Sequence, residues 1–284
     1  MQAIDHLLRP IEIKDKPVFD RYLKQFPQQL SDYSFTNLAC WKCRGNTWAE
    51  HEGHLFISFI DGDERVYMPP VGPKTEDIMR SMPNVHWSRL NETIAHQMPP
   101  QLPAHVLCHK ADYVYSVKEL IELAGKKYDG KRNFIRRVEK ENPVVKALDA
   151  SSSDACFGLY ETWYQNFEHK TRTLEEERSA FKIALDHYAE LDLRGIGVWI
   201  GGNLKAYAIG DQLSDAMTVE IFEKATTDVT GMYQYVLHAY AKSLDPSVTL
   251  LNREEDLNIA SLRKAKESWY PIELLQKYEV TAKE

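Results

Sequence analysis

The chain has 284 residues, of which 43% are hydrophobic and 27% charged, proportions that exclude an intrinsically disordered protein. Its formal net charge of −7 excludes a generic nucleic-acid binder. No apolar run of about 18 residues occurs, and residues 1–16 lack the apolar stretch of a signal peptide, so we expect a soluble, cytoplasmic protein with no integral membrane segment. The length predicts two domains.

The first half of the sequence alternates short strand and helix signals. An extended segment at 8–13 precedes a helix whose apolar residues recur at spacings of three and four. Three strands around the Asp61-Gly62-Asp63 turn follow as a meander. Beyond them we expect a helix at 74–82, a strand at 85–90, a helix at 91–98, one strand over 105–116 and a helix that ends at Gly125.

The second half gives a clearer pattern. After a strand at 144–148, a serine-rich segment offers N-caps for a helix with one aromatic face, formed by Phe157, Tyr160, Trp163, Tyr164 and Phe167. We expect this face to be core and not a platform for stacking bases. Next come a second helix from about Thr173, strands at 195–200, 204–213 and 217–225, a helix at 232–244, a strand at 248–252 and a helix at 261–269. In the strand at 217–225, Val219 and Ile221 alternate with Glu220 and Phe222.

This order of one strand, two helices, a three-stranded meander, a helix and a parallel strand is that of the GNAT acyltransferase fold. In that fold the fourth and fifth strands splay apart and open a cleft. Because the first half repeats the order loosely, the sequence predicts an α/β (α+β) protein of two tandem GNAT-like domains with mixed, mostly antiparallel sheets. We expect the domains to cover residues 1–125 and 126–284, with the active cleft in the second.

Several segments also carry a family likeness. They are DYSFTNL (32–38), VYMPPVG (66–72), ELAGKKYDGKRNFIRRVEKEN (122–142), FEKAT (222–226) and NREEDLNIASLRKAKESWYP (252–271). Together they resemble the DUF2156 family, which is related to the C-terminal domain of phosphatidylglycerol lysyltransferases. The resemblance implies a tandem GNAT fold similar to Fem-type peptidyltransferases and other enzymes that use aminoacyl-tRNA. In contrast to true lysyltransferases, we expect no multi-helix membrane region in this chain, which argues against a lipid substrate.

The segment that would bind coenzyme A in GNAT enzymes is degenerate here. Those enzymes hold the pyrophosphate on backbone N–H groups of a glycine-rich loop before a helix. The corresponding segment, 225–233, has Gly231 as its one glycine, lacks the Q/R-x-x-G-x-G/A pattern, and carries Asp228 where it would repel an anion. The usual mode of acyl-CoA binding is therefore disfavoured, although acyl-CoA remains the alternative donor.

A basic run offers another anion site. Residues 126–140 hold seven Lys or Arg against one Asp and one Glu. Arginine grips phosphate with two hydrogen bonds, and lysine supplies a compact charge. The candidate anion-binding residues of the run are Lys126, Lys127, Lys131, Arg132 and Arg136. A tRNA acceptor end, or another phosphate-bearing donor, is the functional interpretation; a solvated helix between the domains is the structural one.

A third group of candidate functional residues lies at the end of the strand at 248–252. Transfer of an acyl group from an ester to an amine needs a positive group near the developing oxyanion and a base for the amine. Arg253 or Lys264 would serve as the first, and Glu220 or Glu223 as the second. Asn252, Asp256 and Lys266 are further candidate substrate-binding residues. The alternative is a structural ion-pair network of Glu220, Glu223, Arg253 and Lys264.

Other chemistries have weaker support. Cys40 and Cys43 form a CxxC pair, but no second CxxC or paired histidine motif completes a zinc site, so we expect no metal. No GxSxG, Walker A or strand-borne GxGxxG motif occurs. The sequence thus predicts a GNAT-type acyltransferase that moves an aminoacyl group from tRNA to a small amine or hydroxyl acceptor. The alternatives are an acyl-CoA-dependent N-acyltransferase and a non-catalytic GNAT-like ligand-binding protein.

Overall fold

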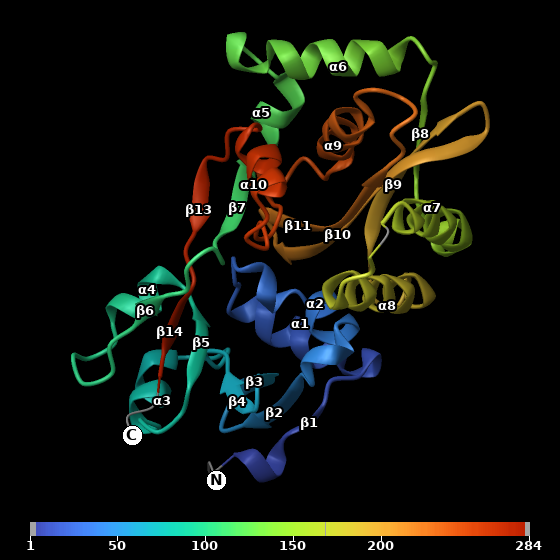
Figure 1. The fold of residues 1–284 in the computed structure, drawn as a ribbon. Coiled ribbons are helices and arrows are strands. Elements are labelled where there is room, and N and C mark those ends of the chain that lie inside the picture. Colours follow the sequence, from blue (N-terminus) through green and yellow to red (C-terminus); the bar gives the residue numbers. More distant parts are fainter. Residues whose placement is uncertain (1–3, 168, 282–284) are drawn as a thin grey trace.

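The computed structural model describes residues 4–167 and 169–281, and these residues form two seven-stranded sheets (Figure 1). Each sheet is mostly antiparallel with one parallel pair, β4 with β5 in the first and β11 with β12 in the second. The fold is thus α/β with two mixed, mostly antiparallel sheets, as the sequence predicted.

The first sheet is built mainly from the N-terminal half. Its strand order is β1 (Arg9–Pro10), β2 (Thr47–His51), β3 (His54–Asp61), β4 (Glu64–Tyr67), β5 (Trp87–Leu90), β14 (Tyr278–Val280) and β6 (His105–Val106). The helices of this half are α1 (Lys16–Gln25), α2 (Phe35–Cys40), α3 (Thr75–Ser81) and α4 (Glu92–His96). The β1 strand covers only two residues of the extended segment that we expected at 8–13.

The second sheet has the order β13 (Glu273–Leu275), β7 (Asp112–Ser116), β12 (Leu250–Asn252), β11 (Met217–Ala225), β10 (Asn203–Ser214), β9 (Arg194–Ile200) and β8 (Val144–Ala147). Its helices are α5 (Val117–Glu122), α6 (Asp129–Glu139), α7 (Ser153–Gln165), α8 (Arg172–Asp186), α9 (Met232–Ser243) and α10 (Ala260–Glu267). From β8 to β12 the elements follow the GNAT order, which confirms the expectation for this half.

Helices cover both faces of the second sheet. On one face α9 lies against β9, β10 and β11 with α6 beyond it, and on the other face lie α7 and α8 (Figure 1). Most of the aromatic face of α7 is part of the core, since Tyr160 and Tyr164 are buried and the Tyr160 ring contacts Phe181 of α8. Phe167, which we expected on this face, follows the end of the helix and is exposed. The same core continues into α1 and α2, so the apolar interior is shared between the two halves.

The two sheets exchange strands across residue 125. The single strand expected over 105–116 is two strands, because β6 pairs in the first sheet and β7 in the second. The chain then returns at its C-terminal end, where β13 pairs with β7 and β14 inserts between β5 and β6 (Figure 1). Each sheet therefore contains at least one strand from the opposite half of the sequence: β14 in the first sheet and β7 in the second. A domain boundary between residues 125 and 126 stays a prediction.

Candidate active site

The parallel strands β11 and β12 pair over a short length and then separate. Their register covers Met217 to Val219 on β11 and Leu250 to Asn252 on β12. Beyond this point β11 continues to Ala225, whereas the chain after Asn252 stays beside β7, to which β12 is paired, and Arg253 N donates to the Tyr113 carbonyl at 2.9 Å. The strands thus diverge where the GNAT order predicts, with Glu220 on one side and Arg253 on the other.

A β-bulge in β11 sets the direction of its two glutamates. In the pairing with β10, Ile209 lies opposite Phe222 while Gly210 lies opposite Glu220, so Ile221 is an extra residue without a partner. The bulge corrects the simple alternation expected for this strand: Phe222 packs in the core under α7 and α8, whereas Glu220 and Glu223 both turn to the side of Arg253. Without the extra residue, positions 220 and 223 would point to opposite faces.

Arg253 bridges this carboxyl pair. Its Nε contacts Glu220 Oε2, and its Nη2 donates to Glu223 Oε2 at 2.5 Å. The side chain of Glu220 is 4% exposed and that of Arg253 is 12% exposed. Burial, together with the charge of Glu220, raises the pKa of Glu223 to about 8. The two carboxyl groups therefore share one arginine, and burial beside Glu220 favours the protonated form of Glu223.

Lys131 is the residue of the basic run that approaches this cluster. It projects from α6 toward the end of α10, where its Nζ lies 2.6 Å from Ser268 Oγ and 4.4 Å from the ring centre of Trp269. Burial, and then repulsion by Arg253, lower the pKa of Lys131 to about 8. Lys131 thus lies close enough to Arg253 to be affected by its charge, although Arg253 itself is paired with Glu220 and Glu223.

The other candidates of the basic run make local contacts or lie in solvent. Lys126 is exposed, and Lys127 forms an ion pair of 2.8 Å with a glutamate of α5. Arg132 donates to backbone carbonyls before α6, and Arg136 bonds an asparagine of its own helix at 3.3 Å. Among the five, Lys131 is the residue that the described structure brings toward Arg253.

The candidates after β12 divide in a similar way. Asn252 is fully buried, and Asp256 accepts hydrogen bonds from Tyr113 and from Arg263, both at 2.7 Å. Lys264 is exposed on α10, whereas Lys266 is buried and its Nζ contacts the Arg253 carbonyl. Burial, and then Arg253, lower the pKa of Lys266 to about 8. The structure therefore brings Glu220, Glu223 and Arg253 together in an ion-pair network, with Lys266 beside them. Lys264, which we expected in the same group, lies at the surface.

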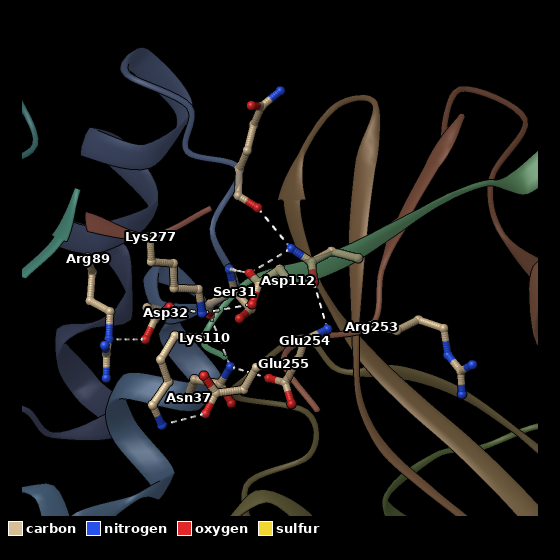
Figure 2. Close-up of polar contacts among 12 residues, drawn as sticks. Ser31, Asp32, Asn37, Arg89, Lys110, Asp112, Arg253, Glu254, Glu255 and Lys277 are labelled. Atoms are coloured by element: carbon tan, nitrogen blue, oxygen red, sulfur yellow. Dashed lines mark hydrogen bonds and ion pairs between the residues drawn. The ribbon is translucent and has the colours of Figure 1, made fainter. Parts of the chain in front are cut away.

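A second buried ionic cluster, which the sequence did not indicate, lies beside Asn252 between the sheets (Figure 2). Lys277 places its Nζ 2.5 Å from Asp32 and 2.7 Å from Asp112. Arg89 Nε also pairs with Asp32, at 2.9 Å, and Asn252 Nδ2 donates to Asp112 at 3.0 Å. The one signal in the sequence was the DYSFTNL segment, which begins at Asp32 and drew attention only through its family likeness.

The segment before α9 approaches α6 at Gly231, whereas Thr227, Asp228 and Thr230 are exposed. Gly231 has a positive φ of 101°, and a Cβ atom there would lie 2.8 Å from the Phe134 carbonyl oxygen of α6. Asp228 is paired with Lys205 at 2.6 Å. The helix start that holds pyrophosphate in coenzyme A-dependent GNAT enzymes is therefore in close contact with protein in this chain.

Residues 4–167 and 169–281 contain no group of three or more His, Cys, Asp or Glu side chains placed to hold a metal ion. The two cysteines of the CxxC pair differ in exposure: Cys40 is buried and Cys43 is exposed. Over the same described residues, no helix combines the length and apolar character needed to span a membrane.

Comparison with known proteins includes a close overall match of structure. A conserved protein of unknown function from Bacteroides thetaiotaomicron is 26% identical, with a TM-score of 0.90 over 97% of this chain and 99% of that one. L-PGS from Bacillus licheniformis has a TM-score of 0.67 at 11% identity, over 96% of this chain and 94% of that one. The C-terminal DUF2156 domain of an Agrobacterium fabrum protein assigned as a lysylphosphatidylglycerol synthetase also has a TM-score of 0.67 at 11% identity, over 95% and 92%.

A curated relative in sequence is the uncharacterized protein MYCGA3080 of Mycoplasmoides gallisepticum, which is 22% identical over 173 residues. The match covers 59% of this chain and 54% of that protein, so it spans about half of the relative's length. The profile of the family described as "Phosphatidylglycerol lysyltransferase, C-terminal" matches residues 23–281. The chain therefore belongs to this family, and family and fold together point to a GNAT-like acyltransferase.

Proposed function

We propose that the chain takes an aminoacyl group from a charged tRNA and transfers it to a small amine or hydroxyl acceptor. The observation that carries the proposal is the approach of Lys131, from the basic run, to Arg253 at the point where β11 and β12 separate. Burial disfavours the charged form of Lys131, so an anion bound beside this lysine would stabilise its charge, and the phosphates at the end of a tRNA supply such an anion.

The carboxyl pair supplies the proton transfer that the reaction needs. The acceptor nitrogen or oxygen attacks the ester carbonyl carbon, the bond from that carbon to the ribose oxygen breaks, and the acceptor's proton moves to the ribose oxygen. In this mechanism the Glu220–Glu223 pair accepts the proton from the acceptor and returns it to the leaving oxygen. Arg253 holds both carboxyl groups in place, and Lys131 lies on the side from which a phosphate-bearing donor would approach.

The resemblance to Fem-type peptidyltransferases and other enzymes that use aminoacyl-tRNA supports this choice of donor. The solved structures of L-PGS and of FemX, which is 9% identical to this chain, have the same fold, with TM-scores of 0.67 and 0.59. An acyl-CoA donor has less support, because the segment before α9 has one glycine, which packs against Phe134 of α6, and the exposed Asp228 would repel a pyrophosphate. The proposed tRNA partner therefore agrees better with this degenerate segment than the alternative donor does.

Binding of charged tRNA measured by gel shift tests the donor. Phosphate contacts release counterions, so affinity for aminoacyl-tRNA should fall steeply between roughly 50 and 200 mM salt. Uncharged tRNA and double-stranded DNA of similar length serve as controls. Equal and weak binding of all three nucleic acids, or no binding at low salt, would contradict the proposal.

A further inference from the structure

A cavity of about 350 Å³ lies under the C-terminal end of α9, on the face of the second sheet that α9 covers. Arg194, at the start of β9, and Asp245, just after α9, line it, as does Tyr240 of α9. Ligand pockets range from about 300 to 1,000 Å³, so this cavity has the size for a small metabolite and not for a long acyl chain.

The cavity has one positive and one negative side. Arg194 is exposed at its edge, with a guanidinium that can bind a carboxylate through two hydrogen bonds. On the other side are Asp245 and the last turn of α9, including Ser243 and Leu244. The final carbonyl groups of a helix lack N–H partners within the helix and give that end a partial negative charge, which favours a cation.

The charged side chains lie near each other without neutralising each other fully. Hydrogen bonds from Ser247 and, less strongly, the charge of Arg194 lower the pKa of Asp245. Arg194 also lies 3.9 Å from Asp192, with both side chains well exposed. Exposed ion pairs of this kind are weak, so Arg194 and Asp245 both remain able to bind a ligand.

The interior of the cavity provides an apolar wall and an unsatisfied hydroxyl. Ile196, Leu244 and Val248 supply hydrocarbon surface. Tyr240 is 1% exposed, and its hydroxyl has no hydrogen-bond partner among the described residues. This hydroxyl lies against Gly210, where any Cβ atom would collide with it, so the backbone of β10 holds it beside the cavity. Buried polar groups usually have a partner.

From this arrangement we infer that the cavity binds a small free amino acid with an apolar side chain. Its carboxylate would pair with Arg194, its ammonium group with Asp245 and the end of α9, and its side chain would pack on Ile196, Leu244 and Val248. The inference does not depend on the proposed transfer reaction, because it concerns an equilibrium binding site that needs neither tRNA nor catalysis.

The test is a calorimetric titration of the full chain with three probes of one shape. L-leucine carries both charged groups, 3-methylbutylamine lacks the carboxylate, and 4-methylpentanoate lacks the amine. We expect leucine to bind and each analogue to bind at least tenfold more weakly. Equal binding of leucine and either analogue, or no heat and no shift in melting temperature with any of the three, would overturn the inference.

Two conservative variants locate the site. Arg194→Gln and Asp245→Asn should each weaken leucine binding at least fivefold while the melting temperature stays close to that of the unaltered chain, because both side chains are exposed. Arg137→Gln, on α6, makes the same change of charge away from the cavity and should leave binding unchanged. If leucine binds equally to all four proteins, its site lies elsewhere and the assignment to this cavity is wrong.

Discussion

Arg253 Nη2 lies 2.5 Å from Glu223 Oε2, and this contact crosses the space where β11 and β12 have separated. It exists because the bulge at Ile221 turns Glu223 to the same side as Glu220. One guanidinium then serves two buried carboxyl groups. Such an arrangement favours retention of one proton, and the stability of the fold should depend on pH as a result.

Glu223→Gln should reduce this pH dependence. The pKa of Glu223 is raised to about 8, so its proton stabilises the fold fully below the ordinary glutamate value and progressively less as pH rises through 8. In the unaltered chain, loss of this proton should lower the free energy of unfolding by up to about 1.4 kcal/mol for each unit that the pH rises between 5 and 8. Urea denaturation at pH 5.5, 7 and 8.5 measures the slope, which should be shallower in the variant. Glu273→Gln, an exposed change on β13, is the control, and equal slopes in all three proteins would contradict the coupling.

Lys131→Met should weaken binding of phosphate-bearing ligands. The methionine keeps the packing on Trp269 but removes the charge beside Arg253. We expect the affinity for charged tRNA to fall about tenfold at fixed salt, in line with loss of one partly buried charge-assisted contact. Lys140→Met, an exposed change at the end of α6, removes the same charge and should have a much smaller effect. Matching losses in the two variants would mean that the basic run acts only through its total charge.

The same lysine predicts a pH effect on binding. Burial and Arg253 lower the pKa of Lys131 to about 8 in the free protein, and an anion bound beside it favours the charged form. Binding of inorganic phosphate or tRNA should therefore weaken as pH rises from 7 to 9, and this part of the dependence should vanish in Lys131→Met. A fluorescence or calorimetric titration at three pH values measures it, and a dependence that persists unchanged in the variant would assign it to another group.

Asp112→Asn should destabilise the fold strongly. Asp112 is 0% exposed and contacts Lys277, which is 2% exposed, so the change leaves a buried lysine with less compensation. Removing one partner of a buried ion pair typically costs about 3–5 kcal/mol. A double-mutant cycle with Lys277→Met, followed by chemical denaturation, should show a coupling energy above about 1 kcal/mol. Additive effects would show that the two residues do not act as a pair.

The exchanged strands predict that the halves depend on each other. A fragment of residues 1–125 lacks β14, and a fragment of residues 126–284 lacks β7, which pairs with both β12 and β13. We expect neither fragment to give a dispersed NMR spectrum alone and a mixture of the two to recover one. A cooperatively folded 126–284 fragment would contradict this and would support a domain boundary at that place.

Much of the second half was predictable because its signals are local. Turn residues and apolar periodicity give the meander and the helices, and their order gives the fold. The meeting of Arg253 with Glu220 and Glu223 also followed from the expected separation of β11 and β12. Lys266 was harder to tell from Lys264, because a short helix with several basic residues does not reveal from spacing alone which lysine is buried.

The remaining features depend on contacts between distant segments. The bulge at Ile221 arises where Gly210 lies against Tyr240, and nothing in the local sequence of β11 indicates it. The division of 105–116 between two sheets follows from the return of the C-terminal strands, and the pairing of Lys277 with Asp32 and Asp112 follows from the same return. Because Asp32, Asp112 and Lys277 lie far apart in the sequence, no local pattern predicts that they meet.

Transfer of a labelled aminoacyl group tests the central proposal most directly. The chain is incubated with tRNA charged with a mixture of labelled amino acids and with a pool of small amines and alcohols. The measured quantity is the labelled amino acid that has left the tRNA and is covalently attached to an acceptor. We predict transfer well above the rate of spontaneous ester hydrolysis, a loss of at least tenfold in Lys131→Met, and near-normal transfer in Lys140→Met. Label that leaves tRNA no faster with the chain than without it, for every amino acid and acceptor in the mixture, would contradict the account.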